Sequence, residues 1–186
     1  MNPKVYLITG PIGSGKSTAC NYLKKIGKET VDLDSVSNSI LENSESTGFL
    51  KKNFDSCIIN GKIDRKLLAE IVFKQPEKLK LLEGYLHPLV TQELGKIIQN
   101  VESDLFIEVS APKNLHKEFF TIVIISDENV RRERLKLRGM SPDDIDNRIN
   151  TQPNEEWWRS LGTVIQNDTI TGLENNLNKI LNFKDE

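Results

Sequence analysis

The sequence predicts a three-layer α/β fold, in which a parallel five-stranded sheet packs between helices and carries a helical insertion and a helical lid. Three observations predict this fold. Short apolar runs of strand length alternate with helical patterns near both ends of the 186-residue chain. A glycine-rich loop, Gly10 to Ser17, joins the first run to the first helix. Residues 35–87, between the two ends, carry almost no strand signal.

The first strand and the first helix flank this loop. Val5 to Thr9 is a short apolar run bounded by Pro3 and Gly10, a length that favours a buried parallel strand over a helix. After the loop, apolar residues recur at the spacing of one helix face, and Gly27 follows where a helix would end. These apolar residues are Ala19, Tyr22, Leu23 and Ile26.

The second strand and the inserted helices come next. Val31 to Asp34 alternates apolar and acidic residues, so we expect a short strand with Asp34 at its tip. From residue 35 to about residue 101 the apolar residues keep helical spacings. We expect helices to begin at Pro76 and at Pro88, because proline suits the first turn of a helix. Residues 35–87 are therefore predicted to form an inserted helical subdomain.

The core resumes in the second half of the chain. Residues 105–109 and 119–125 are apolar runs of strand length, and 163–166 is a further candidate strand. Ser126 and Asp127 suit the N-cap of a charged helix that ends near Gly139, and Ser141 suits the N-cap of a second. Residues 131–152 thus form an arginine-rich helical lid, and the core comprises 1–34, 88–130 and 153–186. A closing helix is marked by Leu173, Leu177, Ile180 and Leu181.

The composition is that of a globular protein in aqueous solution. Hydrophobic residues make up 37% and charged residues 28%, with a formal net charge of -2. Such a balance does not favour a nucleic-acid partner, which usually requires a basic surface. No segment is long and apolar enough to cross a bilayer, and we read no signal peptide, so we expect a cytoplasmic protein. Cys20 and Cys57 fit no disulfide or zinc pattern and are expected to be reduced, packed thiols.

The loop after the first strand has the Gly-x-x-x-x-Gly-Lys-Ser pattern of a phosphate-binding P-loop. Glycines let backbone N–H groups approach phosphate oxygens, and the following helix adds its positive N-terminal end. Lys16 would neutralise the β- and γ-phosphates of ATP, and the Ser17 hydroxyl would bind Mg²⁺. An accidental glycine-rich turn is the alternative, but the flanking strand and amphipathic helix argue against it. The expected nucleotide-binding residues here are Gly13, Ser14, Gly15, Lys16, Ser17 and Thr18.

The rest of the sequence must show which P-loop class this is. The Asp-x-x-Gly and Asn/Thr-Lys-x-Asp elements of a GTPase are absent. Glu108 could be a degenerate acidic strand end of the ATPase type, although such a residue is more often just the end of a strand. A kinase needs a carboxylate that orients an attacking hydroxyl and accepts its proton. Asp32 and Asp34 are the candidates, on the strand face opposite Val31 and Leu33; the alternative is an acidic strand edge or a helix cap.

A kinase also needs cations that neutralise the transferring phosphoryl group. Arg134, Arg138 and Arg148 in the predicted lid would supply them. The alternative is an exposed charged helix, which the interleaved Glu133 supports.

Several segments together resemble the dephospho-CoA kinase family over nearly the whole chain. They are Thr9 to Thr18, Val31 to Asp34, Asn60 to Arg65, Leu86 to Val90, the lid from Arg134 to Gln152, and Val164 to Asn167. The resemblance implies a P-loop kinase fold and transfer of the ATP γ-phosphoryl group to the ribose 3′-hydroxyl of dephospho-CoA, with Mg²⁺. It implies Asp34 as catalytic base, Lys16 on the phosphates, and Arg138 and Arg148 as lid arginines. It also implies that Arg65 and His87 lie in the region that binds the acceptor, and that Asn167 lies near the adenine of ATP.

The chain departs from the family at three places. Pro11 replaces the usual second glycine, and Asp168 replaces the usual glycine after Asn167. The segment Glu108 to Leu115, which includes Ser110 to Pro112, stands where the family has a Pro-Leu-Leu-Phe-Glu stretch and several further residues that line the acceptor cleft. A nucleoside, nucleotide or other small alcohol is therefore an alternative acceptor, and a non-catalytic ATP-binding regulatory module is an alternative of another class. We expect a small-molecule substrate, no nucleic-acid or membrane partner, and a monomer or weak homo-oligomer.

Overall fold

The structure is a computed structural model that describes residues 3–182 of the chain. It divides into two compact units: a core unit of Met1–Asp32 with Val101–Glu186, and a helical unit of Leu33–Asn100. The insertion predicted from the sequence spans residues 35–87, so the helical unit is longer at both edges. Each unit has a hydrophobic core of its own.

The core unit contains the predicted parallel five-stranded sheet, with strand order β2-β5-β1-β6-β7. All four strand pairs in it are parallel. The central strand β1 pairs with β5 on one side and β6 on the other, which brings Tyr6 between Phe106 and Phe120. The bounds are Val5–Thr9 for β1, Glu29–Asp32 for β2, Leu105–Glu108 for β5, Phe120–Ile125 for β6 and Thr163–Gln166 for β7.

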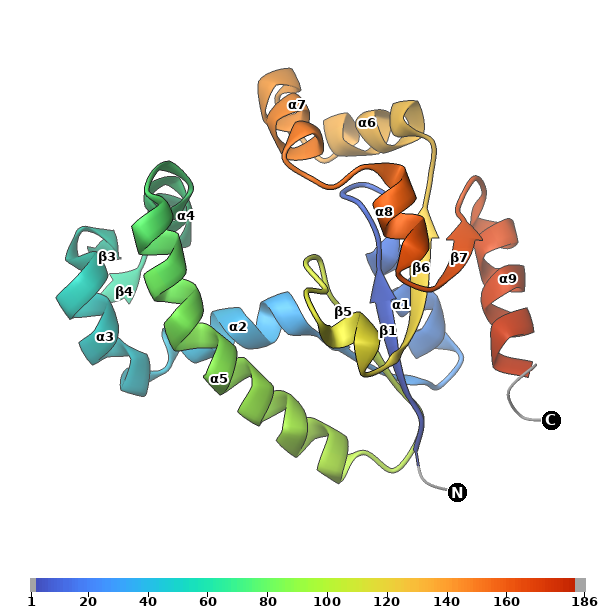
Figure 1. Ribbon diagram of the computed structural model, residues 1–186, viewed down its shortest axis with the longest axis horizontal. Coiled ribbons are helices and arrows are strands. Elements are labelled where there is room, and N and C mark those ends of the chain that lie inside the picture. The colour runs from blue at the N-terminus through green and yellow to red at the C-terminus, as the bar shows by residue number, and fades with distance from the viewer. Residues whose placement is uncertain (1–2, 183–186) are drawn as a thin grey trace. The chain divides into compact units, whose positions relative to one another are not determined.

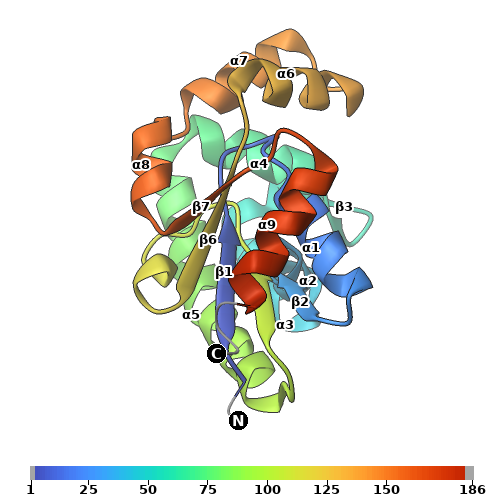
Figure 2. The same cartoon turned by 90° about the vertical axis from the view of Figure 1, so that its right-hand side faces the viewer.

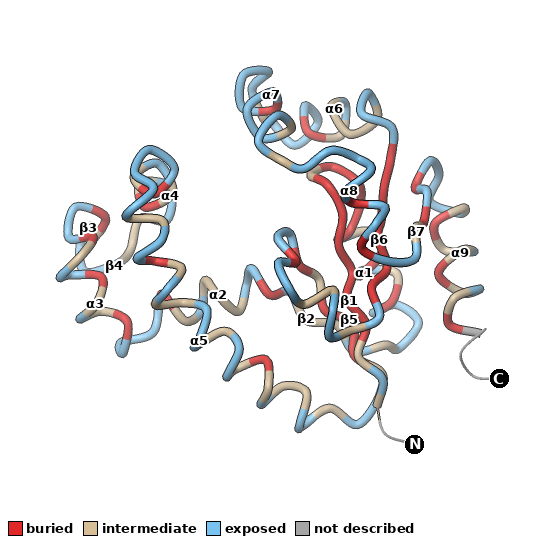
Figure 3. The backbone as a smooth tube through the Cα atoms, in the orientation of Figure 1, coloured by how far each residue is buried: buried red, intermediate tan, exposed pale blue. Residues whose placement is uncertain are grey.

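Helices cover both faces of this sheet (Figures 1 and 2). Successive side chains of β6 point to opposite faces of the sheet, as the two-residue period of a strand requires. Ile122 and Ile124 pack with α1 (Lys16–Lys25) and α9 (Ile170–Asn182), whereas Val123 and Ile125 pack against Trp158 of α8 (Glu155–Ser160). The central strands are therefore buried along their length (Figure 3). The core unit has the three-layer α/β architecture that the sequence predicts.

Residues 131–152, predicted to form a lid, lie mostly in two short helices after β6, both with the predicted caps. The Asp127 side chain accepts a hydrogen bond from the Asn129 N–H at the start of α6 (Glu128–Leu137), and Ser141 caps α7 (Pro142–Asn150) in the same way. Gly139, with a φ of 82°, ends the first helix. Arg132 forms ion pairs with Glu128 on its own helix and with Asp146 of α7. The two lid helices are thus joined to each other by a side-chain contact.

The helical unit packs four helices around an apolar cluster. They are α2 (Leu33–Glu42), α3 (Ser44–Phe54), α4 (Arg65–Lys74) and α5 (Pro76–Asn100). Short 3₁₀ turns lie at Asp55–Cys57 in this unit and at Leu115–Lys117 in the core unit. The buried cluster consists of Leu41, Leu50, Phe54, Cys57, Leu68, Val72 and Leu82.

A β-hairpin in the helical unit was not expected from the sequence. β3 (Ile58–Ile59) pairs antiparallel with β4 (Lys62–Ile63). The turn residues Asn60 and Gly61 both have positive φ, at 52° and 76°. Asn-Gly is the preferred pair for a two-residue hairpin turn with positive φ at both positions, so the signal was present but was not recognised.

The expectation of a new helix at Pro88 is wrong. α5 runs without a break from Pro76 to Asn100, and Pro88 lies inside it. Proline removes one backbone hydrogen bond and normally interrupts a helix. Here Leu82 and Leu94 are both buried, one before and one after the proline. Packing of the two halves outweighs the local cost.

The placement of Asp34 at a strand tip is also wrong. β2 ends at Asp32, and Asp34 lies in the first turn of α2. Leu33 is buried as the first residue of this helix, so Asp32 and Asp34 do not alternate along one strand. An acidic side chain is favourable in the first helical turn, and a four-residue alternation is too short to exclude that arrangement.

Two further expectations concern the thiols and the membrane. Cys20 and Cys57 are both free and buried, as predicted. Within residues 3–182, none of the helices has the length and apolar character that crossing a bilayer requires.

Candidate active site

The glycine-rich loop lies between the carboxyl end of β1 and the N-terminus of α1. Gly15 is the N-cap residue of α1 and has a φ of 101°, a left-handed conformation that glycine adopts without strain. A Cβ atom at this position would overlap the side-chain amide of Asn167. The predicted residues Lys16, Ser17 and Thr18 form the first turn of the helix, where backbone N–H groups have no partner within the helix. This is the arrangement that binds anions.

The Lys16 side chain is enclosed by the loop and is only 9% exposed. Its Nζ donates hydrogen bonds to the carbonyl oxygens of Gly10 at 2.9 Å and Pro11 at 3.3 Å. A buried ammonium group requires such partners. The positive charge is thereby held within the curve of the loop.

The hydroxyl of Ser17 contacts a carboxylate that the sequence interpretation left aside. Ser17 Oγ donates a hydrogen bond to Glu108 Oε1 at 2.7 Å. Glu108 is the last residue of β5, the strand next to β1. The neighbouring Cys20 thiol also contacts Glu108; burial, and then this carboxylate, raise the pKa of Cys20 above its ordinary value. The hydroxyl predicted to bind Mg²⁺ and an acidic side chain are therefore adjacent.

The outer side of the loop is held by Arg134 of α6. Its Nη1 donates to the carbonyl oxygens of Gly13 (3.3 Å) and Ser14 (3.2 Å) and to Ser126 Oγ (2.9 Å). Its Nη2 donates to the Asn167 carbonyl oxygen at 3.1 Å. Burial, and then the nearby charge of Arg138, lower the pKa of Arg134. Arg134 thus braces the loop from the side opposite the N–H groups.

Asn167 and Ser126 complete this brace. Asn167 is 2% exposed, and its Nδ2 donates to the Ser14 carbonyl oxygen at 2.7 Å. Ser126 Oγ lies 3.1 Å from the same oxygen and 2.8 Å from the Asn167 carbonyl oxygen, and its single proton can be donated to either. Asn167, predicted to lie near the adenine, therefore lies against the phosphate loop in this structure. Its role toward the adenine stays a prediction.

Of the three arginines predicted to neutralise the phosphoryl group, Arg134 binds the outer side of the loop, and the other two lie on exposed helix ends. Arg138 is the C-cap residue of α6, and Arg148 lies in the last turn of α7. Both side chains are exposed to solvent. An exposed arginine side chain can change rotamer without breaking buried contacts, as closing over a bound nucleotide would require.

The predicted acceptor residues all lie in the helical unit. Asp34 is exposed in the first turn of α2, and His87 is exposed on α5. Arg65 begins α4 and approaches Glu42 of α2 at 3.7 Å, an exposed ion pair. The same unit has a cavity of 360 Å³ lined by Leu41, Glu42, Thr47, Leu50, Ile58, Gly61, Lys62 and Ile63.

Comparison with known proteins identifies the family. The family model described as dephospho-CoA kinase matches residues 5–172. A dephospho-CoA kinase of Aquifex aeolicus is 35% identical over 172 residues, covering 86% of each chain. The crystal structure of TT1252 from Thermus thermophilus is 33% identical, covers 97% of each chain and has a TM-score of 0.88. The chain belongs to the dephospho-CoA kinase family.

Family membership settles the class of P-loop protein. A shikimate kinase from Bacteroides thetaiotaomicron shares the fold at a TM-score of 0.56 and 14% identity, with 98% of this chain covered. The chain is an ATP-dependent phosphotransferase of the dephospho-CoA kinase family, as the loop and the resemblance predicted. The motor-ATPase interpretation of Glu108 is not supported.

Sequence reasoning missed several residues that the structure brings to the loop. Glu108 was noted only as a strand end, although its position on a strand beside the loop's own strand was a usable signal. Arg131 and Gln152, the first and last residues of the predicted lid, both hydrogen-bond to Ile12. No local pattern predicts these contacts, because more than a hundred residues separate the partners.

Proposed function

We propose that this kinase transfers the γ-phosphoryl group of ATP to the ribose 3′-hydroxyl of dephospho-CoA, which gives coenzyme A. One observation carries the proposal: the family match spans residues 5–172, which includes the loop, the lid and the whole helical unit. Acceptor identity in a P-loop kinase depends on the inserted unit, and here that unit lies entirely within the matched range.

The donor half of the reaction is assigned to the loop and the lid. The backbone N–H groups from Gly13 to Thr18 bind the phosphates, and Lys16 exchanges its carbonyl partners for phosphate oxygens. Arg138 and Arg148 approach the transferring group when the lid closes, and the closed lid excludes water as a competing acceptor. Most of the rate acceleration then comes from positioning and charge neutralisation.

Residues at the loop fit a magnesium ion. Ser17 Oγ and Glu108 Oε1 are oxygen atoms 2.7 Å apart, and Mg²⁺ prefers oxygen ligands from hydroxyls, carboxylates, water and phosphates. When bound, Mg²⁺ neutralises charge that develops on the β- and γ-phosphate oxygens. Ser17 would hold the ion, and Glu108 would orient the Ser17 hydroxyl by accepting its hydrogen bond.

Residues of the helical unit are assigned to the acceptor. Asp34 accepts the proton of the 3′-hydroxyl as its oxygen forms a bond to the γ-phosphorus, and the bond between that phosphorus and the bridging oxygen of ADP breaks. Arg65 and His87 bind the acceptor. Arg65 forms a long, exposed ion pair with Glu42, which an anionic ligand could displace at little cost.

The test is an ADP-release assay on the full chain with ATP and Mg²⁺. Dephospho-CoA is compared with adenosine, nucleoside monophosphates and shikimate, and mass spectrometry checks for a phosphate on the 3′-oxygen. We expect ADP release with dephospho-CoA alone. Activity on a nucleoside monophosphate and none on dephospho-CoA would assign a different acceptor. ATP binding without ADP formation from any acceptor would favour the regulatory module.

Location and assembly belong to the same proposal. We expect the protein to act in the cytoplasm, where ATP is plentiful, and to be a monomer or a weak homo-oligomer. Size-exclusion chromatography with light scattering checks the second expectation.

A further inference from the structure

Side chains from both ends of the lid form hydrogen bonds to one residue of the phosphate loop. Gln152 Oε1, at the end of the lid, accepts a hydrogen bond from the Ile12 N–H at 2.9 Å. Arg131 Nη1, at the start of the lid, donates to the Ile12 carbonyl oxygen at 3.3 Å. Both polar backbone groups of Ile12 are therefore held by side chains of the lid segment, residues 131–152.

The second contact also orients the next residue. The peptide unit between Ile12 and Gly13 is planar and trans, so its C=O and N–H groups point in opposite directions. Because the carbonyl faces Arg131, the Gly13 N–H is turned to the other side of the loop. Gly13 is itself pressed against the Arg131 backbone, since a Cβ there would lie 2.9 Å from the Arg131 carbonyl oxygen.

Burying the Arg131 guanidinium beside the loop has an unfavourable desolvation free energy. Its side chain is only 12% exposed, and its ion pair with Glu128 is long, at 3.9 Å. Its buried Nε has no hydrogen-bond partner within the part of the chain that the structure describes, and burial lowers the pKa of its guanidinium. A buried, weakly paired cation contributes little stability, so another role must account for its burial.

The contact is also not tightly packed. Arg131 and Gln152 line a 340 Å³ cavity, together with Pro11, Ser126 and Trp158 among others. This pocket is open to solvent, so it is a cleft beside the contact and not a void in a packed interior. The side chains therefore have room to move when the lid moves.

We propose that Arg131 and Gln152 are positioning residues that couple the lid to the phosphate loop, by holding Ile12 so that the Gly13 N–H faces the phosphates of ATP. Lid position then alters the phosphate affinity of the loop. The inference rests on the proposed function only in taking ATP as the donor.

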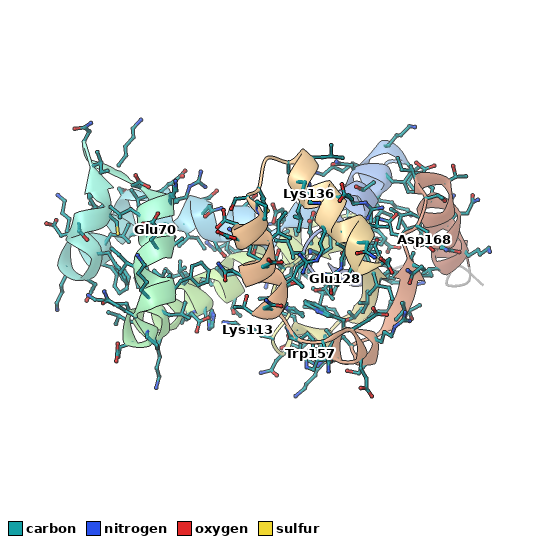
Figure 4. All side chains as sticks on the ribbon, turned by 90° about the horizontal axis from the view of Figure 1, so that it is seen from above. Glu70, Lys113, Glu128, Lys136, Trp157 and Asp168 are labelled. Atoms are coloured by element: carbon teal, nitrogen blue, oxygen red, sulfur yellow. The ribbon has the colours of Figure 1, made fainter. Side chains whose placement is uncertain are left out.

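The experiment uses the full chain with the single variants Arg131→Met and Gln152→Met and the double variant. Lys136→Met is the control: Lys136 is an exposed residue of the same helix α6 (Figure 4), and it forms an ion pair with Glu133. Calorimetry gives the Kd of ATP, and steady-state kinetics give KM for ATP and for dephospho-CoA. Thermal unfolding without nucleotide reports stability separately.

We expect each single variant to weaken ATP binding about tenfold, the scale of one hydrogen bond to a charged group. KM for dephospho-CoA and the Tm without nucleotide should stay near those of the wild type. Because both side chains hold the same residue, Ile12, through the two peptide groups that flank it, the double variant should also lose about tenfold rather than about a hundredfold. The control should bind ATP as the wild type does.

Three results would overturn the inference. The first is an ATP Kd within about twofold of the wild type in both single variants, which is well inside the tenfold expectation. The second is a multiplicative loss in the double variant. The third is failure of both single variants to fold, which would make the contacts structural. A different result separates the two proposals. If the wild type and the variants show the expected ATP affinities but the wild type does not phosphorylate dephospho-CoA, the proposed function is wrong and the coupling between lid and loop is supported.

Discussion

The hydroxyl of Ser17 and the carboxylate of Glu108 form a hydrogen bond of 2.7 Å that joins the first turn of α1 to the end of β5. The two residues are 91 positions apart in the chain, and the parallel pairing of β1 with β5 brings them together. A carboxylate that holds a metal-binding hydroxyl in one orientation usually affects metal affinity strongly. The first prediction concerns this pair.

Glu108→Gln should raise the Mg²⁺ concentration needed for half-maximal activity by about tenfold or more, because outer-shell partners of metal ligands typically contribute that much. Initial rates measured over a Mg²⁺ titration check it. Glu118→Gln, an exposed acidic residue of the same unit, is the control. An unchanged Mg²⁺ dependence in Glu108→Gln would show that the carboxylate does not support the metal.

Asp34→Asn should reduce turnover by about a hundredfold or more while ATP binding stays near that of the wild type, since a general base acts only on the acceptor. Calorimetry with ATP and steady-state kinetics separate the two effects. Asp55→Asn, an exposed aspartate of the same unit, should be fully active. Turnover near that of the wild type in Asp34→Asn would remove Asp34 from the mechanism.

Arg134→Met should lower the free energy of unfolding by about 2 kcal/mol, because a buried carbonyl group that loses its partner costs about that much. The Ser14 carbonyl would keep Asn167 and Ser126 as partners, but the Gly13 carbonyl would lose Arg134. Urea unfolding monitored by circular dichroism measures the change. Lys136→Met, the control, should unfold at the same urea concentration as the wild type. Equal unfolding midpoints for the wild type, Lys136→Met and Arg134→Met would show that Arg134 does not stabilise the loop.

The Cys20 thiol should make stability fall at high pH. Burial and Glu108 raise its pKa above the ordinary value of 9.0, so the folded state keeps the proton that the unfolded chain releases. The contribution is fully present below pH 9.0 and is lost as the pH rises further, by up to about 1.4 kcal/mol per pH unit. Unfolding free energies at pH 8 and pH 10 should therefore differ less in Cys20→Ala than in the wild type. An equal difference in both proteins would exclude this thiol as the source.

Local signals in the sequence predicted most elements of the core, because the features that form them are local. The P-loop pattern needs only Gly10 to Ser17, and the caps Asp127 and Ser141 bond to N–H groups two or three residues away. Failures occurred where tertiary packing outweighed local preference. Pro88 stays inside α5 because Leu82 and Leu94 are buried on either side of it.

The candidate site was predictable only on the side that faces the phosphates. The pattern identified Lys16 and Ser17, since the chemistry of triphosphate binding requires those residue types at that spacing. The opposite side of the loop is held by Arg131, Arg134 and Gln152, whose partners lie more than a hundred residues away. An arginine on a charged lid helix, or a glutamine just after one, has no pattern that distinguishes a structural contact from an exposed side chain.

The brace on Ser14 has a consequence for how the chain folds. Its carbonyl oxygen is held by Asn167, 153 residues further along the chain, and by Ser126, 112 residues away. Contacts of such long range form late, because the intervening chain must be ordered first. The loop predicted to bind the nucleotide is made before β6 and β7, yet it acquires this shape only after both strands have joined the sheet. A nascent chain should thus be unable to hold ATP until Asn167 has been made and β7 has paired with β6.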